Sequence, residues 1–348
     1  MKFENTIELV GYGHPDRFAD YIAEKALTML LKLDNRAKVA LEIMVMRNQI
    51  IIGGEITANT NINKKWWSQL VKEAIDDIYI YDKKTKTRDG GLGKYKLIVN
   101  VQKQSLELNH LQQDALVAGD QGVIFGYYDQ VRFKQINLLY EIITAVKNNF
   151  PYPLISADWK LLYNPRVKSL SISFCGEQTK DLKKIDDFIK SIIKKTPKYS
   201  DLVKSVLLNP GGAWLLGGPQ TDTGVTGRKI MIDNFGAGVS HGGGNITGKD
   251  LSKVDKTGVI QATMIAYEIS KKANHKSPVL VELNYCIGED RPQIWFQFNN
   301  QWQKYEGQVE TLEDFIANHK LLFIDWGKVL KNGGLISYFS EQFKEDNI

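Results

Sequence analysis

The sequence predicts an α/β fold in which mixed sheets carry helices packed on one face. Two observations support this prediction. Strand-like segments next to a long amphipathic helix recur three times along the chain, although no sequence repeat is detectable. The length of 348 residues also exceeds one ordinary domain and suits two or three.

The first round of this pattern covers the N-terminal third. Residues 16–31 have the periodicity of an amphipathic helix, and residues 38–46 and 50–57 alternate like two strands joined by a short turn. A second helix is expected around 65–80. The charged, glycine-containing stretch 82–94 is typical of a surface loop.

Two further rounds follow. Strands are expected at 168–175 and 204–208 around a helix at 181–194, and the apolar run 123–127 predicts a buried strand. The last round places strands near 228–233, 279–287 and 293–298 around a helix at 253–272.

Two polar stretches, 102–122 and 209–252, interrupt this order. Glycine is denser in the second than a strand or helix tolerates, so the chemistry is expected there.

Composition excludes several classes of protein. Hydrophobic residues make up 43% and charged residues 24%, as in soluble globular proteins. No apolar run reaches the roughly 20 residues of a membrane span, and the N-terminus lacks the apolar core of a signal peptide, so a cytoplasmic protein with no membrane partner is expected. The net charge of +5 is mild, and the scattered lysines are typical of solvated helix faces. This reading is favoured over a nucleic-acid patch, and a polyanionic small ligand would suit the positive balance equally well.

Cysteine and histidine give no sign of a structural metal or disulfide framework. Cys175 and Cys286 lie far apart in apolar, strand-like runs, which predicts buried free thiols. The five histidines show no metal-ligand spacing.

The segment 241–255, HGGGNITGKDLSKVD, is equipped for a polyphosphate. Its consecutive glycines expose backbone N–H groups and permit positive φ, and Lys249 and Lys253 follow four residues apart. Ser252 and Asp255 predict a capping box that starts a helix at Lys253, whose N-terminus adds positive charge. A glycine-rich surface turn with solvated lysines is the alternative.

Two familiar nucleotide motifs are excluded. Gly243–Lys249 fits the first half of a Walker P-loop, but Asp250 stands where that motif needs a hydroxyl for magnesium. The dinucleotide fingerprint also fails, because no third glycine follows Gly11 and Gly13 at the required spacing.

Two other segments carry clustered charge. In 11–20, GYGHPDRFAD, the residues His14, Asp16 and Arg17 crowd one helix entrance, as at a phosphate and metal corner. In 209–229, irregular glycine-rich backbone is followed by adjacent Arg228 and Lys229. Trp214 in that stretch is either a core residue or a stacking face for a base.

Together these segments resemble the S-adenosylmethionine synthetase (methionine adenosyltransferase) family. The matching segments occur in one order: GHPDRFAD at 13–20, GGEIT at 53–57, AGDQGVIFGY at 118–127, GGPQTDTGVTGRKIMIDNFG at 217–236 and HGGGNITGKDLSKVD at 241–255. The resemblance covers most of the chain as far as Asp255 and is looser beyond it.

This resemblance implies three similar domains of mixed sheet with helices, arranged with pseudo-threefold symmetry: 2–101, 114–215 and 217–345. It implies formation of S-adenosyl-L-methionine by attack of methionine sulfur on C5′ of ATP, followed by hydrolysis of triphosphate to pyrophosphate and phosphate. Two Mg²⁺ ions and K⁺ are the implied cofactors. A homodimer or homotetramer with active sites at the subunit interface is the implied assembly.

The resemblance also implies residue roles. It assigns catalysis to His14, Lys160, Arg228, Lys229 and Lys249. It assigns ATP binding to His14, Asp158, Lys160, Trp214, Leu215, Asp222, Arg228, Lys229, Asn245 and Lys249. It assigns methionine binding to Glu55, Gln104, Asp120, Asp222 and Lys253, magnesium to Asp16 and Asp255, and potassium to Glu42.

Three features depart from the family pattern. Arg17 stands where lysine is common, and Ala213 stands where arginine usually precedes the stacking aromatic. The segment 102–117 corresponds to a mobile gate in the family, and it is shorter and more apolar here than the family's gate. A kinase-like phosphotransferase that uses the same polyphosphate loop is one alternative function, and a noncatalytic nucleotide-binding homologue is another.

Overall fold

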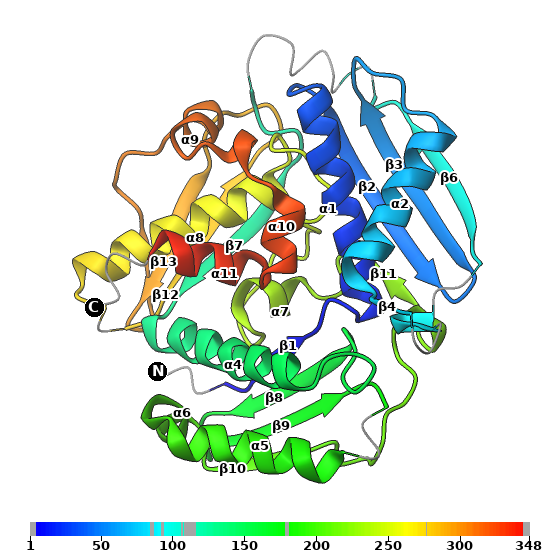
Figure 1. Ribbon diagram of the computed structural model, residues 1–348. Coiled ribbons are helices and arrows are strands. Elements are labelled where there is room, and N and C mark those ends of the chain that lie inside the picture. Colours follow the sequence, from blue (N-terminus) through cyan, green and yellow to red (C-terminus); the bar gives the residue numbers. More distant parts are fainter. Residues whose placement is uncertain are drawn as a thin grey trace.

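The computed structural model describes residues 5–83, 87–91, 94–105, 107, 116–177, 181–275 and 277–343. Within these ranges the strands form three four-stranded sheets and one small two-stranded sheet, and helices cover one face of each large sheet (Figure 1). The gate predicted at 102–117 lies largely outside the described residues.

The first sheet has the order β11-β2-β3-β6. Its strands are β2 (Lys38–Met46), β3 (Gln49–Thr57), β6 (Lys96–Gln102) and the short β11 (Gly224–Val225). Helices α1 (Pro15–Leu33) and α2 (Lys64–Ile78) pack on it, which confirms the helices and strands expected in the first round. The loop expected at 82–94 contains the small sheet of β4 (Tyr81–Asp82) and β5 (Thr87–Arg88), followed by η1 (Asp89–Gly91).

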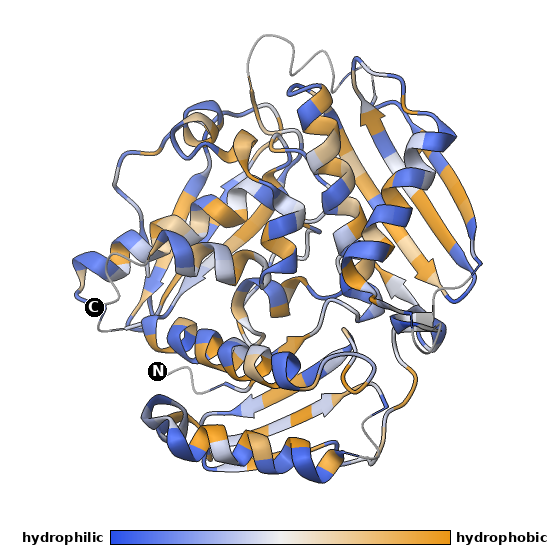
Figure 2. Ribbon diagram, in the orientation of Figure 1, coloured by the Kyte–Doolittle hydropathy of each residue, from blue (hydrophilic) through white to orange (hydrophobic). Residues whose placement is uncertain are grey.

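The second sheet has the order β1-β8-β9-β10. It contains β1 (Ile7–Val10), β8 (Trp159–Asn164), β9 (Ser169–Phe174) and β10 (Ser205–Leu208). Beside it lie α4 (Gln130–Asn149), α5 (Leu182–Lys195) and α6 (Pro197–Leu202). Figure 2 shows α5 with a hydrophilic outer edge and a hydrophobic edge toward the sheet.

The third sheet has the order β14-β13-β12-β7 and is antiparallel throughout, whereas the other two are mixed. It contains β7 (Gly122–Tyr128), β12 (Val279–Tyr285), β13 (Gln293–Phe298) and β14 (Gln301–Lys304), and α8 (Val254–Lys272) packs on it. The centre of the molecule is closed by α7 (Ile230–Phe235), α10 (Trp326–Lys331) and α11 (Gly334–Gln342), while η3 (Gly218–Gln220), α9 (Leu312–Asn318) and η4 (Leu321–Phe323) complete the fold.

Each sheet takes one strand from a distant part of the sequence. Strand β1 pairs with β8, β7 pairs with β12, and β11 pairs with β2. The three sheets are therefore interleaved along the chain, and the domain ranges 2–101, 114–215 and 217–345 remain a proposal.

Three local predictions were wrong. Residues 228–233 do not form a strand but lead into helix α7, which ends at Gly236 in the left-handed conformation and buries Phe235. Helix α8 begins at Val254, and the expected capping box of Ser252 and Asp255 does not form. The Ser252 hydroxyl and backbone N–H both donate to Asp250, which closes the turn before the helix. Cys175 is buried as expected, but Cys286 is exposed because it follows the end of β12.

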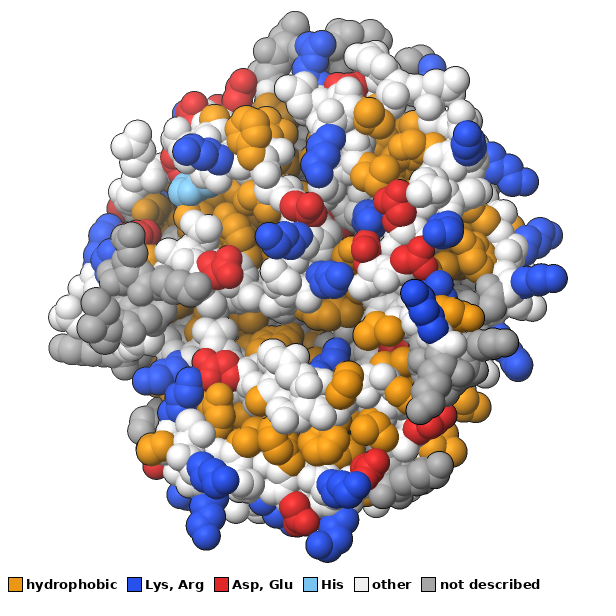
Figure 3. All heavy atoms as spheres, viewed as in Figure 1, with side chains coloured by type: hydrophobic (Ala, Val, Ile, Leu, Met, Phe, Trp, Pro, Cys, Tyr) orange, Lys and Arg blue, Asp and Glu red, His pale blue; other side chains and the backbone are white. Residues whose placement is uncertain are grey.

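The surface matches the mild net charge. On the face in Figure 3, Lys and Arg side chains are scattered among Asp and Glu and do not gather in one patch. Among the described residues, no helix has the length and apolar character needed to cross a membrane.

Candidate active site

His14 stands at the N-terminus of α1. Its Nδ1 accepts a hydrogen bond from the Asp16 backbone N–H at 3.2 Å, so the imidazole caps the helix and carries its proton on Nε2. Burial, with the nearby Lys229 and Lys160 charges, lowers the pKa of His14 to about 4. At neutral pH this residue is therefore a neutral hydrogen-bond donor.

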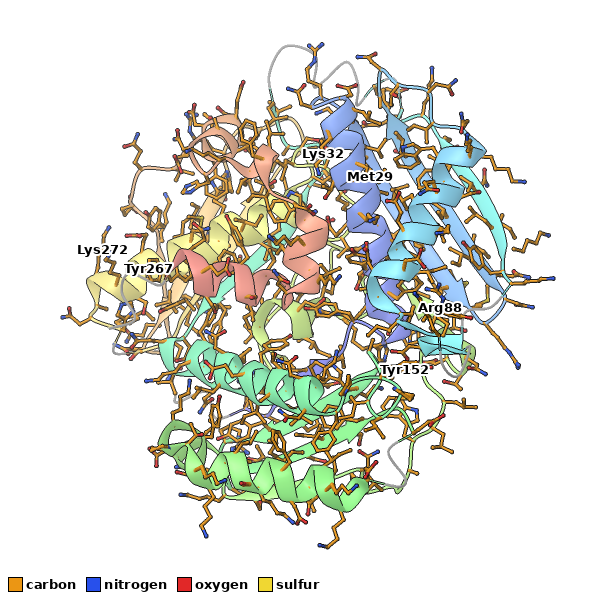
Figure 4. The ribbon with its side chains drawn as sticks, viewed as in Figure 1. Met29, Lys32, Arg88, Tyr152, Tyr267 and Lys272 are labelled. Carbon is orange, nitrogen blue, oxygen red and sulfur yellow. The ribbon has the colours of Figure 1, made fainter. Side chains whose placement is uncertain are left out.

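In Figure 4 the labelled Arg88 lies near the N-terminal end of α1, and the labelled Met29 and Lys32 lie on the other half of the helix. The Arg88 guanidinium donates to the Tyr79 carbonyl at 3.0 Å, and the Tyr79 hydroxyl donates to the Gly13 carbonyl at 2.9 Å. The turn that carries His14 is thereby fixed to the end of α2.

Asp16 joins α1 to the segment that carries the adjacent cations. Its carboxylate accepts from the Val225 backbone N–H at 2.9 Å and pairs with the Lys229 Nζ at 2.6 Å. The Arg228 Nε lies 3.6 Å from the same carboxylate, and the Arg228 side chain is mostly exposed. Asp16 at the start of α1 and the cations Arg228 and Lys229 thus meet, although they are more than 200 residues apart in sequence.

Asp158 and Lys160 lie beside this cluster at the start of β8. The Asp158 Oδ2 accepts from the Gly218 backbone N–H at 2.7 Å, and burial raises the pKa of this carboxyl to about 6. Lys160 is exposed, and the exposed Asp222 follows η3. Asp222 and Lys160 both act electrostatically on Asp158 and on His14, which places all four groups in one region.

Trp214 forms a parallel bridge with Cys175, and its carbonyl accepts from the Gly176 N–H at 2.8 Å. The indole is partly exposed, and its N–H donates to the Leu216 carbonyl at 2.7 Å. Leu215 is exposed. Because the Cys175 N–H donates to the Asp158 carbonyl at 3.0 Å, this aromatic ring is carried by the same piece of sheet as Asp158.

The segment 241–255 contributes an ion pair between Lys249 and Asp255. A side chain at Gly244 would collide with the Asp255 carboxylate, so glycine there allows the loop to approach this acid closely. Lys249 is bridged to Ala40 on β2, and Lys253 is the residue immediately before α8.

Glu42 lies on the outer face of β2, opposite to the buried Leu41 and Ile43, as the strand alternation predicts. It pairs with the Thr226 hydroxyl and accepts from the Asn245 Nδ2 at 3.3 Å. Strand β2 thereby contacts both glycine-rich segments, 209–229 through Thr226 and 241–255 through Asn245.

The residues expected around methionine come from several segments, and Asp222 lies in the same region as Asp158 and His14. Glu55 pairs in register with Ala40, the residue bridged to Lys249. The buried Gln104 donates its backbone N–H to Thr57 at 3.1 Å, two residues beyond Glu55. Asp120 is exposed and accepts from the neighbouring Gln121 N–H at 2.8 Å, so its carboxylate caps its own loop.

Sequence reasoning missed two buried acids on α1, Asp20 and Glu24. Asp20 accepts from the Gly227 N–H and the Thr247 hydroxyl, and Glu24 pairs with the buried Lys256 at 2.7 Å. The sequence signal that could have found them is the four-residue spacing of Asp16, Asp20 and Glu24, which aligns three acids on one helix face.

The acids suit hard metal ions. Among the described residues no three His, Cys, Asp or Glu side chains cluster as a metal site. Mg²⁺ usually takes one or two carboxylates, with water and substrate phosphates supplying the other oxygens, so Asp16 and Asp255 fit that role. The oxygens of Glu42 and Thr226 are likewise hard donors that suit an alkali cation.

The interleaved sheets and the convergence of His14, acids and Lys/Arg groups define an α/β enzyme that handles a polyphosphate. The S-adenosylmethionine synthetase N-terminal domain model matches residues 2–106, and the C-terminal domain model matches 216–323. The chain belongs to the S-adenosylmethionine synthetase family.

Relatives of known name agree with this membership. An S-adenosylmethionine synthase from Mycoplasmopsis synoviae (strain 53) is 31% identical, over 84% of this chain and 78% of that protein. One from Borrelia garinii subsp. bavariensis is 32% identical, over 82% of this chain and 78% of its own length. The fold resembles that of an unusual S-adenosylmethionine synthetase from Campylobacter jejuni, with TM-score 0.77, 23% identity and 98% of each chain covered.

Proposed function

We propose that this protein forms S-adenosyl-L-methionine from ATP and L-methionine and releases pyrophosphate and phosphate. Methionine sulfur displaces triphosphate at C5′ of ATP, and the bound triphosphate is then hydrolysed. The observation that carries the proposal is the meeting of His14, Asp16, Arg228 and Lys229 at the start of α1.

The neutral His14 donates from Nε2 to the oxygen that leaves C5′, where negative charge develops. Sulfur is already a good nucleophile, so catalysis consists of alignment and charge stabilisation, without a covalent enzyme intermediate. Lys160, Arg228, Lys229 and Lys249 hold the triphosphate.

Two lysines of the site pair with the two acids that are proposed to hold Mg²⁺. Lys229 is held by Asp16 and Lys249 by Asp255. When the triphosphate chain of ATP binds, both lysines would turn to its phosphate oxygens, and the two acids would then be available to hold Mg²⁺. Bound Mg²⁺ supplies charge neutralisation along the triphosphate.

The remaining assignments are those that the resemblance to the family implies. Trp214 stacks on adenine, Asp158 contacts the ribose, and Leu215 and Asn245 line the nucleotide site. Glu55, Asp120 and Asp222 surround the methionine amino group, and Gln104 and Lys253 hold its carboxylate end. Glu42 binds K⁺.

The working unit in this proposal is a homodimer or a larger homo-oligomer of the cytoplasm. The outer face of β2 and β3 supports it, because Met44 is exposed there beside Ile51, its partner in the strand register. A second copy would cover this face and close the site around Glu42.

The deciding experiment incubates the purified protein with ATP, L-methionine and Mg²⁺ and identifies the products by mass spectrometry. S-adenosylmethionine with pyrophosphate and phosphate is the expected result. Formation of ADP without S-adenosylmethionine would instead identify a phosphotransferase, and no turnover at all would identify a noncatalytic homologue.

A further inference from the structure

One face of α1 carries three buried acids that contact different parts of the site. Asp16, Asp20 and Glu24 are four residues apart and are each at most 3% exposed. Asp16 pairs with Lys229, and Glu24 pairs with Lys256. Among the described residues, the middle acid, Asp20, has no cation as its hydrogen-bond partner; it accepts from two neutral donors.

Those donors come from the two cation-bearing loops. The Asp20 Oδ1 accepts from the Gly227 backbone N–H at 2.9 Å and from the Thr247 hydroxyl at 2.8 Å. Gly227 immediately precedes Arg228, and Thr247 lies two residues before Lys249. A single carboxylate oxygen therefore joins both loops to the same turn of α1.

Asp20 is fully buried, so it cannot touch the substrate itself. Burial raises the pKa of Asp20 to about 6, so the carboxylate is charged at pH 7 and remains a strong acceptor. The loops it holds are glycine-rich, with Gly227 and Gly248 at positive φ, and such backbone has little conformational preference of its own. Both loops also contact β2, and Asp20 adds the anchor on the α1 side that helps to fix the spacing between their cations.

We propose that Asp20 is a positioning residue that sets the spacing of Arg228 and Lys229 relative to Lys249 and so matches the site to a triphosphate. This role rests on the proposed function. It concerns the phosphate end of the site, so it affects binding of the triphosphate chain more than binding of methionine.

The test measures binding of inorganic tripolyphosphate with Mg²⁺ by calorimetry, together with kcat and the two KM values for S-adenosylmethionine formation. In Asp20→Ala the tripolyphosphate Kd should rise about tenfold or more, because a buried acceptor with two donors is lost. The kcat should fall, and the ATP KM should rise more than the methionine KM. Asp20→Asn keeps an oxygen acceptor and should restore the Kd to within about threefold of wild type.

A second variant tests the same link from the loop side. Thr247→Val keeps the shape of the side chain and removes only its hydroxyl donor, so the tripolyphosphate Kd should rise by a smaller factor than in Asp20→Ala. Asp129→Ala is the matched control. Asp129 also accepts from a backbone N–H, that of Val131 at 3.0 Å, and from a hydroxyl, that of Tyr127 at 3.1 Å, but it serves α4 and not the loops.

An equal loss of tripolyphosphate affinity in Asp129→Ala and Asp20→Ala would overturn the positioning role, since it would reflect general destabilisation. A rise in methionine KM as large as the rise in ATP KM would overturn it too, as would an Asp20→Asn variant as defective as Asp20→Ala. Failure of the proposed function is separate, because it would appear in the wild-type protein as absence of S-adenosylmethionine.

Discussion

The Arg17 guanidinium and the Asp233 carboxylate form a buried ion pair that joins the first turn of α1 to α7. Arg17 also lies over the Tyr12 ring, with its Cζ 4.6 Å from the ring centroid. The residue that departs from the family pattern thus has its own acid and aromatic partner. Both helices begin at the candidate active site, so the pair fixes their relative position.

Asp233→Ala should destabilise the protein by about 3–5 kcal/mol, because it leaves a buried guanidinium without its counter-charge. Denaturant unfolding followed by circular dichroism measures this. Asp187→Ala on α5 is the control, since its ion pair with Lys183 is exposed, and its cost should be about 1 kcal/mol or less. Equal costs for the two variants would contradict a structural role for the buried pair.

Lys249→Ala should lower kcat for S-adenosylmethionine formation by about 100-fold or more, because a preorganised cation at the triphosphate is removed. The circular dichroism spectrum should be unchanged. Lys183→Ala on α5 is the control, because Lys183 is 91% exposed and pairs with Asp187 on its own helix. Near-normal turnover in Lys249→Ala would remove this lysine from its proposed role.

Trp214→Ala should raise the KM for ATP by about tenfold and leave the KM for methionine nearly unchanged, since stacking on a base contributes about 1–3 kcal/mol. Steady-state kinetics with each substrate varied in turn separates the two values. Trp302→Ala on β14, another partly exposed tryptophan, should change neither. A larger effect on methionine than on ATP would reverse the assignment.

Asp158 should make stability depend on pH between about 4 and 6. Its folded-state pKa of about 6 lies above the ordinary value of 3.8, so its favourable contribution is complete below 3.8 and is lost as pH rises through 6. The wild type should therefore gain about 1 kcal/mol relative to Asp158→Asn when pH falls from 7 to 5. Parallel urea titrations at the two pH values check this, and a constant difference would show that Asp158 titrates normally.

Met44→Glu should dissociate the proposed oligomer, because it replaces the exposed apolar side chain on the outer face of β2 with a charge next to Glu42. Light scattering after gel filtration gives the mass of wild type and variant. Val131→Glu on α4 is the control, since Val131 is also exposed but lies on another element. A wild-type protein of monomer mass would refute the assembly itself.

The sequence alone determined the local elements of this protein and the residue types at its site. Hydrophobic periodicity located α1, α2, α5, β2 and β3, since these elements bury one face whatever their partners are. The order of glycine-rich and charged motifs identified the family before any contact was known.

Only the tertiary structure decided which segments pair and which acids meet which cations. Strand β11 joins β2 across about half the chain, and Asp16 reaches Lys229 through that pairing, which no local pattern records. Residues 228–233 form the start of a helix because Phe235 must be buried and Asp233 must meet Arg17, and these long-range contacts override a short strand-like alternation. Asp20 is visible in the sequence only as one more acid on α1. Its role appears when Gly227 and Thr247 converge on one of its oxygens.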